Sequence, residues 1–399
     1  MQELKRIINY KRIILLLIAA TVNVVFFLYD NKPVMDEDII NKENVAHETY
    51  IKNYHEEVNA IIDNADKLKK YSIFNKAGSF SYANILQTAR DFERVKNVIL
   101  PEDEYKGVQA YTTYYYQYFF TMLVMMFVIY DMFAQRDNGM WSITYSCANG
   151  RIMYAIKQTG VIVVTGAFTH TLIYWSTFIA AMLQRGGVRD LVNPVQTIET
   201  FDKFTYPWSK IKYVTVLYLI SMVCIVALCI TIWGVFVMFR NRVYALVTML
   251  IFAAVEQFIY SHIDIHSVWN GLHYINIINI ININATFSSY RNWGVGTYVF
   301  PVFSVVLFVH IICAGVIGYI AINVSASMKP YKNTTFIKRF MDLWVIPAIE
   351  NENVRKRTID ELPQSGSGST ITTTEPKFIP GVAPVICPVD GVNVKVRLI

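Results

Sequence analysis

The sequence predicts an all-α integral membrane protein of six transmembrane helices, with an α-helical extracytoplasmic insert between the first and the second. Its 399 residues are 54% hydrophobic, 14% aromatic and only 17% charged, which is too apolar for a soluble domain of this size. The apolar residues also form long runs instead of recurring at helical or strand spacing, and a run of about 18 or more residues is long enough to cross a bilayer. Between the first two runs lies a polar segment of about 80 residues, which is too long for a plain loop.

Six apolar runs are expected to form the spans, at residues 13–29, 114–134, 160–183, 213–239, 243–261 and 299–325. The first run follows four basic residues, as a signal peptide would. Its apolar core is long, however, and no small-x-small cleavage pattern follows it, so we interpret it as a retained anchor.

Basic residues near the spans predict the orientation, because Lys and Arg are held on the cytoplasmic side during insertion. With the N-terminus inside, the inner segments carry Lys5, Arg6, Lys11, Arg12, Arg136, Arg151, Lys157, Arg240, Arg242, Lys329, Lys332, Lys338 and Arg339, and the outer segments carry Arg185, Arg189, Lys203, Lys210, Lys212 and Arg291. The net charge of +6 is therefore mostly a topology signal, and we expect no nucleic-acid partner.

The insert, residues 30–112, is expected to be an extracytoplasmic helical hairpin. Apolar residues recur at spacings of three and four along two stretches, at Ile51, Tyr54, Val58, Ile61, Ala65 and Leu68 and at Ile85, Leu86, Ala89, Phe92 and Val95. Two amphipathic helices would bury these stripes against each other. The following "YTTYYYQYFF" is typical of an aromatic belt at the membrane interface, and a carbohydrate-stacking surface is the less favoured alternative.

The later connections and the C-terminal region complete the domain prediction. The fourth and fifth spans are joined by Arg240, Asn241 and Arg242 alone, which predicts an antiparallel pair. The polar, Ile-rich residues 261–296 are expected to lie along the outer interface. Residues 341–399 are Ser-, Gly- and Pro-rich and are expected to form a cytoplasmic, weakly ordered tail, in which "SGSGS" resembles an engineered linker.

Motifs for soluble enzyme chemistry are absent from the sequence. There is no GxxxxGK[ST] phosphate loop, dinucleotide fingerprint, GxSxG or HExxH. The cluster of His262, Asp264, His266 and nearby His273 favours a solvated loop over a metal site, because alternation by two does not share a helical face. The five cysteines, at 147, 224, 229, 313 and 387, show no disulfide or metal spacing.

Ionisable residues inside spans are costly in hydrocarbon and mark either a pathway or a buried pairing. Asp131 and Glu256 lie near span ends, where they reach water. His170 and His310 lie deeper, and a hydrogen bond to a neighbouring helix is favoured over a substrate pathway. His170, Glu256 and His310 are kept as candidates for a translocation path.

Residues 136–160, "RDNGMWSITYSCANGRIMYAIKQTG", predict an interfacial helix, with Met140, Ile143, Ile152 and Met153 on an apolar side and Arg136, Arg151 and Lys157 facing water. A plain cytoplasmic connector is the alternative. This segment is longer than a connector needs, and its aromatic residues suit a protein contact.

This arrangement resembles the membrane subunits of type-2 ABC exporters, in particular permeases of Gram-positive bacteria. The resemblance covers about residues 1–340 and is carried by "YSIFNKAGSFSYANILQTARDFERVKNVIL", "GMWSITYSCANGRIMYAIKQT", "NPVQTIETFDKF" and "LHYINIINIININATFSSYRNWGVG". It implies a six-span permease domain at 1–340. It also implies a coupling helix that docks on an ATPase subunit through Asp137, Trp141, Ser142, Tyr145, Asn149, Gly150, Arg151 and Lys157.

The resemblance further implies a permease subunit in the cell (plasma) membrane, with both termini cytoplasmic, that exports a hydrophobic or peptide-like substrate. The chain would not be an enzyme and would hold no cofactor, because ATP and Mg would be bound by partner ATPase subunits. A second permease and membrane lipid complete the expected partners. The alternative function is a non-transporting receptor or immunity protein that binds a peptide through its insert, and a membrane-embedded enzyme ranks third.

Overall fold

The computed structural model describes residues 10–33, 36–71, 76, 78–101, 106–137, 150–239, 241–263, 269–327, 382–386 and 393–397. The chain divides into two compact units, residues 1–327 and residues 328–399. Each unit is described by itself.

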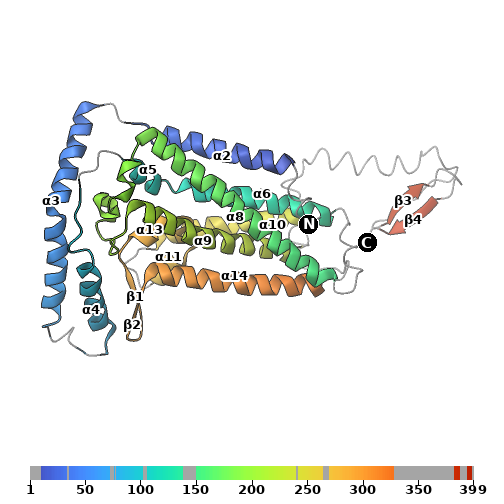
Figure 1. Ribbon diagram of the computed structural model, residues 1–399. Coiled ribbons are helices and arrows are strands. Elements are labelled where there is room, and N and C mark those ends of the chain that lie inside the picture. The colour runs from blue at the N-terminus through green and yellow to red at the C-terminus, as the bar shows by residue number, and fades with distance from the viewer. Residues whose placement is uncertain are drawn as a thin grey trace. The chain divides into compact units, whose positions relative to one another are not determined.

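Six long helices lie side by side in the first unit (Figure 1). They are α2 (Tyr10–Asp30), α6 (Tyr116–Asp137), α8 (Gly150–Arg185), α9 (Lys210–Met238), α10 (Arg242–His262) and α14 (Val302–Ser327). Among the described residues, these six are long and apolar enough to cross a membrane, judged by length and composition. Each overlaps one apolar run, but α8 begins at Gly150 and not near 160, because the amphipathic Arg151–Thr159 stretch continues the helix without a break.

The helix α9 is the centre of this bundle, and it packs against α6, α8, α10 and α14. Small residues allow its close contacts. A Cβ at Gly234 would overlap the side chain of Ile317 on α14, and a Cβ at Gly166 on α8 would come within 2.9 Å of Cys229 Sγ. Glycine at these two positions therefore sets the distance between α9 and its neighbours.

The insert contains two helices that pack on each other, α3 (Glu37–Leu68) and α4 (Phe80–Glu93). Their N-termini are capped by Asp36 and Ser79, whose side chains accept hydrogen bonds from backbone N–H groups. Their shared core is formed by Tyr54, Val58, Phe92 and Val95. Figure 1 shows α3 running across one end of the bundle, which we call the insert end.

The short helix α5 (Gly107–Thr113) leads from the insert into α6. Three tyrosines of the predicted aromatic belt are buried inside the protein, namely Tyr111, Tyr114 and Tyr118, so the prediction is wrong for them. Only Tyr115 and Tyr116 are exposed, with ring centroids 4.4 Å apart. The buried tyrosines pack into the bundle because α5 contacts α8.

Short elements join the helices at the insert end. Between α8 and α9 lie η1 (Arg189–Val192), η2 (Val195–Thr197) and η3 (Glu199–Phe201). Between α10 and α14 lie α11 (Asn270–Ile275), α12 (Ile277–Ile281), α13 (Ile283–Ser288) and the antiparallel strands β1 (Asn292–Val295) and β2 (Tyr298–Pro301). Ile280, Ile283 and Phe287 are buried in the bundle core, so part of residues 261–296 packs inward instead of lying along the interface.

In the second unit the structure describes an antiparallel hairpin of β3 (Val382–Ile386) and β4 (Asn393–Arg397). Val382 is paired with Arg397 and Ile386 with Asn393. The rest of the predicted weakly ordered tail lies outside the described residues. An all-α prediction did not anticipate either hairpin, because runs of four or five residues are too short to give a strong periodic signal.

Candidate functional site

The predicted coupling residues fall largely outside the part of the chain that the structure describes. Trp141, Ser142, Tyr145 and Asn149 are not described, Asp137 is the last residue of α6, and Gly150 is the first of α8. Arg151 Nη1 donates to the carbonyl of Ala326 at 3.5 Å. Lys157 is exposed. The structure therefore shows a contact between the start of α8 and the end of α14, but it does not bring the eight residues together as a surface.

A buried polar cluster lies around His170, on α8. His170 Nε2 is 2.8 Å from Ser221 Oγ on α9, and the Ser221 hydroxyl donates to the carbonyl of Tyr218 at 3.0 Å. With the hydroxyl proton used in this way, the imidazole Nε2–H is the donor to Ser221. The imidazole also stacks on Tyr218 and Tyr118, at centroid distances of 5.8 and 6.0 Å.

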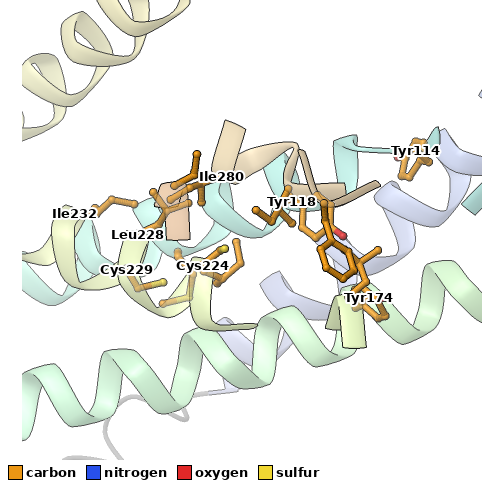
Figure 2. Close-up of a cluster of buried hydrophobic side chains, with 14 of the residues drawn as sticks. Tyr114, Tyr118, Tyr174, Cys224, Leu228, Cys229, Ile232 and Ile280 are labelled. Carbon is orange, nitrogen blue, oxygen red and sulfur yellow. The ribbon is translucent and has the colours of Figure 1, made fainter. Parts of the chain in front are cut away.

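This geometry makes His170 a hydrogen-bonded core residue of the bundle. Ser221 is fully buried and its proton is already donated to a carbonyl, so the pair does not form an activated nucleophile and base. Figure 2 shows Tyr118 of α6 and Tyr174 of α8 in a cluster of buried side chains. The same cluster includes Cys224 and Ile232 of α9. The surroundings are packed and apolar, as expected of a histidine that joins two helices.

A second buried polar contact joins the first helix to the bundle. Asn23 Nδ2 donates to Thr177 Oγ1 at 2.7 Å, and the Tyr114 hydroxyl donates to Asn23 Oδ1 at 3.0 Å. These bonds link α2 and α8 to the residues that precede α6. Polar groups buried in this way are satisfied and fix the register of the helices.

The other path candidates are engaged locally. Glu256 Oε2 accepts from the N–H of Ile277 at 3.1 Å, while its carbonyl accepts from Asn276 Nδ2 at 2.7 Å, so it holds the start of α12 against α10. His310 Nδ1 donates to the Val306 carbonyl of its own helix at 2.8 Å. The candidates thus belong to different contacts, with His170 between α8 and α9 and Glu256 at the insert end of α10.

A group of polar side chains joins α4 to the segment just before α14, and we call it the latch. The sequence did not predict this contact. Asp91 on α4 accepts from Gln87 Nε2 at 2.9 Å and from the Tyr290 hydroxyl at 3.1 Å, and Arg94 Nη1 lies 3.3 Å from its Oδ1. Asn292 Nδ2 donates to Asn84 Oδ1 at 2.8 Å. Burial raises the pKa of Tyr290 to about 12, which keeps its phenol protonated as the donor.

This latch fastens the insert to the segment before α14, and α3 has a latch of its own. The Tyr50 hydroxyl donates to the carbonyl of Gln196, in the connection between α8 and α9, at 2.7 Å. Burial raises the pKa of Tyr50 well above its ordinary value. A signal for the first latch was present in the sequence, because Asn84, Thr88 and Asp91 share one helical face at spacings of four and three.

The residues of the histidine cluster lie apart or make local contacts where the structure describes them. Asp264 and His266 lie outside the described residues, His262 Nδ1 is 3.0 Å from the Phe258 carbonyl, and His273 stacks on Tyr260. Within the described ranges, no three His, Cys, Asp or Glu residues gather to hold a metal ion. Cys224 and Cys229 are buried free thiols and Cys313 is an exposed one.

The C-terminal residues of the chain are similar to a known protein family. Residues 308–399 match the family described as Stage IV sporulation protein A, ATPase domain. Over 82 residues the chain is 51% identical to Stage IV sporulation protein A of Bacillus anthracis, and 49% identical to the proteins of that name from Bacillus subtilis (strain 168) and Clostridioides difficile (strain 630). These matches cover 21% of this chain and 16% of each relative. No solved structure matches.

This finding overturns the transporter interpretation. The resemblance to type-2 ABC exporter subunits is wrong, and with it the predicted functions of export permease and of peptide receptor or immunity protein, because the relatives are sporulation proteins with an ATPase domain. The physical reason for the error is that six apolar runs report bilayer crossing and not a family. The coupling role depended on that resemblance, and a translocation path requires a transporter, so neither role is carried further.

The remaining corrections follow from the same match. The predictions that the chain is not an enzyme and holds no cofactor are wrong, because the matched family is described as an ATPase domain. ABC ATPase subunits and a second permease are likewise wrong as partners, and the predicted plasma-membrane location with cytoplasmic termini is wrong too, because the relatives are Stage IV sporulation proteins. The Ser-, Gly- and Pro-rich composition of residues 341–399 predicted only a weakly ordered tail and gave no sign of this family.

Proposed function

We propose that this chain is a membrane protein of sporulation, in which six membrane-spanning helices carry a C-terminal segment of the kind found in Stage IV sporulation protein A. The observation that carries the proposal is the match over residues 308–399, about half identical to its relatives where they align. That range begins inside α14 (Val302–Ser327) and continues to the last residue. The last candidate span and the sporulation-related segment are therefore one continuous stretch of chain.

The outward surface of the bundle supports the membrane part of the proposal. Large apolar side chains are exposed along α2, α10 and α14, among them Val25, Phe258 and Phe308. In water such a surface is unfavourable by about 25 cal/mol for each Å², and it exceeds the apolar patches that monomeric soluble proteins expose. Hydrocarbon removes that penalty, and the helices satisfy their own backbone hydrogen bonds.

The nucleotide part of the proposal rests on the family description alone. We assign ATP and Mg²⁺ binding to residues 328–399 of this chain itself, in place of a separate subunit. The chain spans 16% of the length of its curated relatives, so hydrolysis of the kind that the complete relatives are named for is a proposal here. The sequence contains no GxxxxGK[ST] loop, and contacts to the phosphates would come from other groups of this segment.

A deletion experiment in the source organism tests the sporulation role. Removing the reading frame should lower the yield of heat-resistant spores and leave vegetative growth unchanged. Full-length chain should restore the yield, whereas a chain truncated after Ser327 should not. An unchanged spore count in the deletion strain would contradict the role, and full rescue by the truncated chain would show that residues 328–399 do not carry it.

Two biochemical measurements test the other parts. Alkaline carbonate washing of membranes should leave the full chain in the pellet, and release into the supernatant would contradict the six-span proposal. Photo-crosslinking with labelled ATP and Mg²⁺ should mark the full chain in nanodiscs but not the chain truncated after Ser327. Equal labelling of both, or of neither, would contradict nucleotide binding by residues 328–399 while leaving the sporulation test intact.

A further inference from the structure

The hairpin β1–β2 has two faces of different composition. Side chains alternate between faces along a strand, and directly paired residues share a face. The register pairs Trp293 with Phe300 and Val295 with Tyr298, so these four residues form one face, which we call the aromatic face. The opposite face carries Asn292, Gly294, Val299 and Pro301. One side of the hairpin is therefore entirely aromatic or aliphatic.

The insert covers the opposite face. A Cβ at Gly294 would overlap the ring of Phe80 on α4, and Asn292 donates to Asn84 on the same helix at 2.8 Å. The aromatic face consequently points away from α4. Figure 1 shows the hairpin between α4 and the first turn of α14, extending past the edge of the bundle. The aromatic face is thus on the side of the hairpin that is turned toward the bundle of long helices.

Most of the aromatic face is exposed. The exposed fractions are 62% for Val295, 71% for Tyr298 and 43% for Phe300, while Trp293 packs its ring 6.0 Å from that of Tyr274. The rings of Tyr298 and Phe300 lie 6.4 Å apart. An uncovered group of this size is unfavourable in water, which indicates that another phase or molecule covers it.

The chain connection fixes the depth at which this face lies. Strand β2 ends at Pro301 and α14 begins at Val302, whose N–H donates to the carbonyl of Arg291 at 2.9 Å. Tyr298 is thus four residues before a candidate span, or within about 14 Å of its start at roughly 3.4 Å per residue. The headgroup layer begins where the span leaves hydrocarbon and is about 5 to 8 Å thick on each side. The hairpin runs across the end of the bundle, so the face stays near that layer.

We propose that the aromatic face of the β1–β2 hairpin is a membrane-interface anchor, seated in the phospholipid headgroups at the insert end of the bundle. This rests on the proposed function, in which the bundle spans a bilayer. Tyr and Trp partition to that layer because one end of each ring is apolar and the other is polar. The exposed Arg291 lies at the base of the hairpin, where its Nη1 donates to the Tyr274 hydroxyl at 3.0 Å, and its guanidinium has further N–H donors for a lipid phosphate.

The test uses an environment-sensitive fluorophore on single cysteines in nanodiscs of phosphatidylcholine and phosphatidylglycerol. Cys147, Cys313 and Cys387 are replaced by Ala, and the buried Cys224 and Cys229 are kept so that the core is unchanged. The probe is attached at Tyr298→Cys. The control is Ile99→Cys, an apolar position of the insert that is even more exposed than Tyr298, at 83% against 71%. Restored Cys313, exposed on α14, reports the span.

Quenching by spin-labelled lipids gives the result. The probe at Tyr298→Cys should be blue-shifted and quenched by a headgroup spin label more strongly than by a label near the end of an acyl chain. The probe at Ile99→Cys should show neither effect. The probe at Cys313 should be quenched by the acyl-chain label.

The outcomes separate the anchor from the proposed function. A probe at Tyr298→Cys that no lipid label quenches, beside a quenched Cys313, would overturn the anchor while the spanning bundle stands. A blue shift at Tyr298→Cys without lipid quenching would indicate a protein cover, such as a second copy, and would also overturn it. Loss of quenching at Cys313 would overturn the membrane proposal itself.

If the cysteine variants fail to assemble, a second measurement applies. The double substitution Val295→Ser and Tyr298→Ser leaves the α4 face of the hairpin intact. It should make the Gly296–Thr297 turn more readily cleaved by protease in nanodiscs, and no change in cleavage relative to the unmodified chain would contradict the anchor.

Discussion

The helices α9 and α10 follow each other in the chain, yet they have opposite places in the bundle. In the most apolar 18-residue stretch of α9, 61% of the residues are buried inside the protein, whereas in the corresponding stretch of α10 only 11% are buried. Both are apolar enough to span a membrane, so hydropathy does not separate them. Specific contacts with other helices separate them. Gly234 of α9 lies close against α14, and the Val214 carbonyl of α9 accepts a hydrogen bond from the Tyr174 hydroxyl at 2.7 Å. Apolarity places a helix in lipid, and small or polar groups at fixed positions place it against other helices.

The largest effect should come from removing the biggest buried side chain of α9. Trp233 is fully buried, and Trp233→Ala should lower the free energy of unfolding by roughly 3 to 5 kcal/mol, through lost contacts and the cavity left behind. Fluorescence-detected thermal unfolding in mild detergent measures the change. Phe258→Ala on the exposed side of α10 is the matched control and should change stability by less than about 0.5 kcal/mol. Equal losses in both variants would remove the distinction between the two helices.

A smaller effect should follow from filling the contact between α9 and α14. Gly234→Val puts methyl groups where Ile317 lies, and overpacking of this kind costs about 1 to 3 kcal/mol. Gly315→Val, on α14, has no atom within 4 Å of its new Cβ and serves as the control. The same unfolding assay should show a lower melting temperature for the first variant alone. Two superimposable curves would mean that α9 and α14 are not in close contact.

The latch between insert and bundle should give a local effect. Asp91→Ala removes the acceptor of Gln87 and leaves the Tyr290 hydroxyl only its longer bond to Thr88 Oγ1, at 3.3 Å, at a cost of roughly 1 to 3 kcal/mol. Hydrogen exchange should speed up in α4 and in residues 288–295 and stay unchanged in α9. Glu93→Ala, exposed on the same helix, should alter neither region. Faster exchange throughout the bundle would show that the insert and the bundle unfold together.

The smallest effect concerns pH. Burial raises the pKa of Tyr290 to about 12, above the value of about 10 expected in an unfolded chain. Its contribution to stability is therefore complete below pH of about 10 and is lost as the pH rises through the folded pKa. The difference in insert protection between the unmodified chain and Tyr290→Phe, measured by hydrogen exchange, should shrink over that range. A constant difference up to the highest pH would contradict the assignment.

The sequence anticipated the positions of the helices better than their partners. Long apolar runs mark helices because hydrocarbon and protein interior both require internally bonded backbone, and whether the six helices cross a membrane stays a prediction. The insert pairing of Tyr54 with Phe92 followed from helical spacing. For the contact of Asp91 with Tyr290, 199 residues apart, the helical face of Asn84, Thr88 and Asp91 marks one side, but nothing local identifies Tyr290 as the partner.

The similarity of the C-terminal residues to a sporulation protein was missed for a different reason. Residues 341–399 are rich in Ser, Gly and Pro, so their composition predicts only a weakly ordered tail. The relation to Stage IV sporulation protein A depends on the order of residues and not on their composition. Composition cannot recover such a relation, since it discards that order.

The packing of α14 against α9 has a mechanical consequence. Any tension applied to the chain after Ser327 acts first on α14, whose largest contact is with α9. It reaches α8 as well, through the bond from Arg151 to the carbonyl of Ala326. A load on residues 328–399 would thus be carried by α9, the most deeply buried of the six long helices, and not by the peripheral α10, so that the bundle resists being pulled apart one helix at a time.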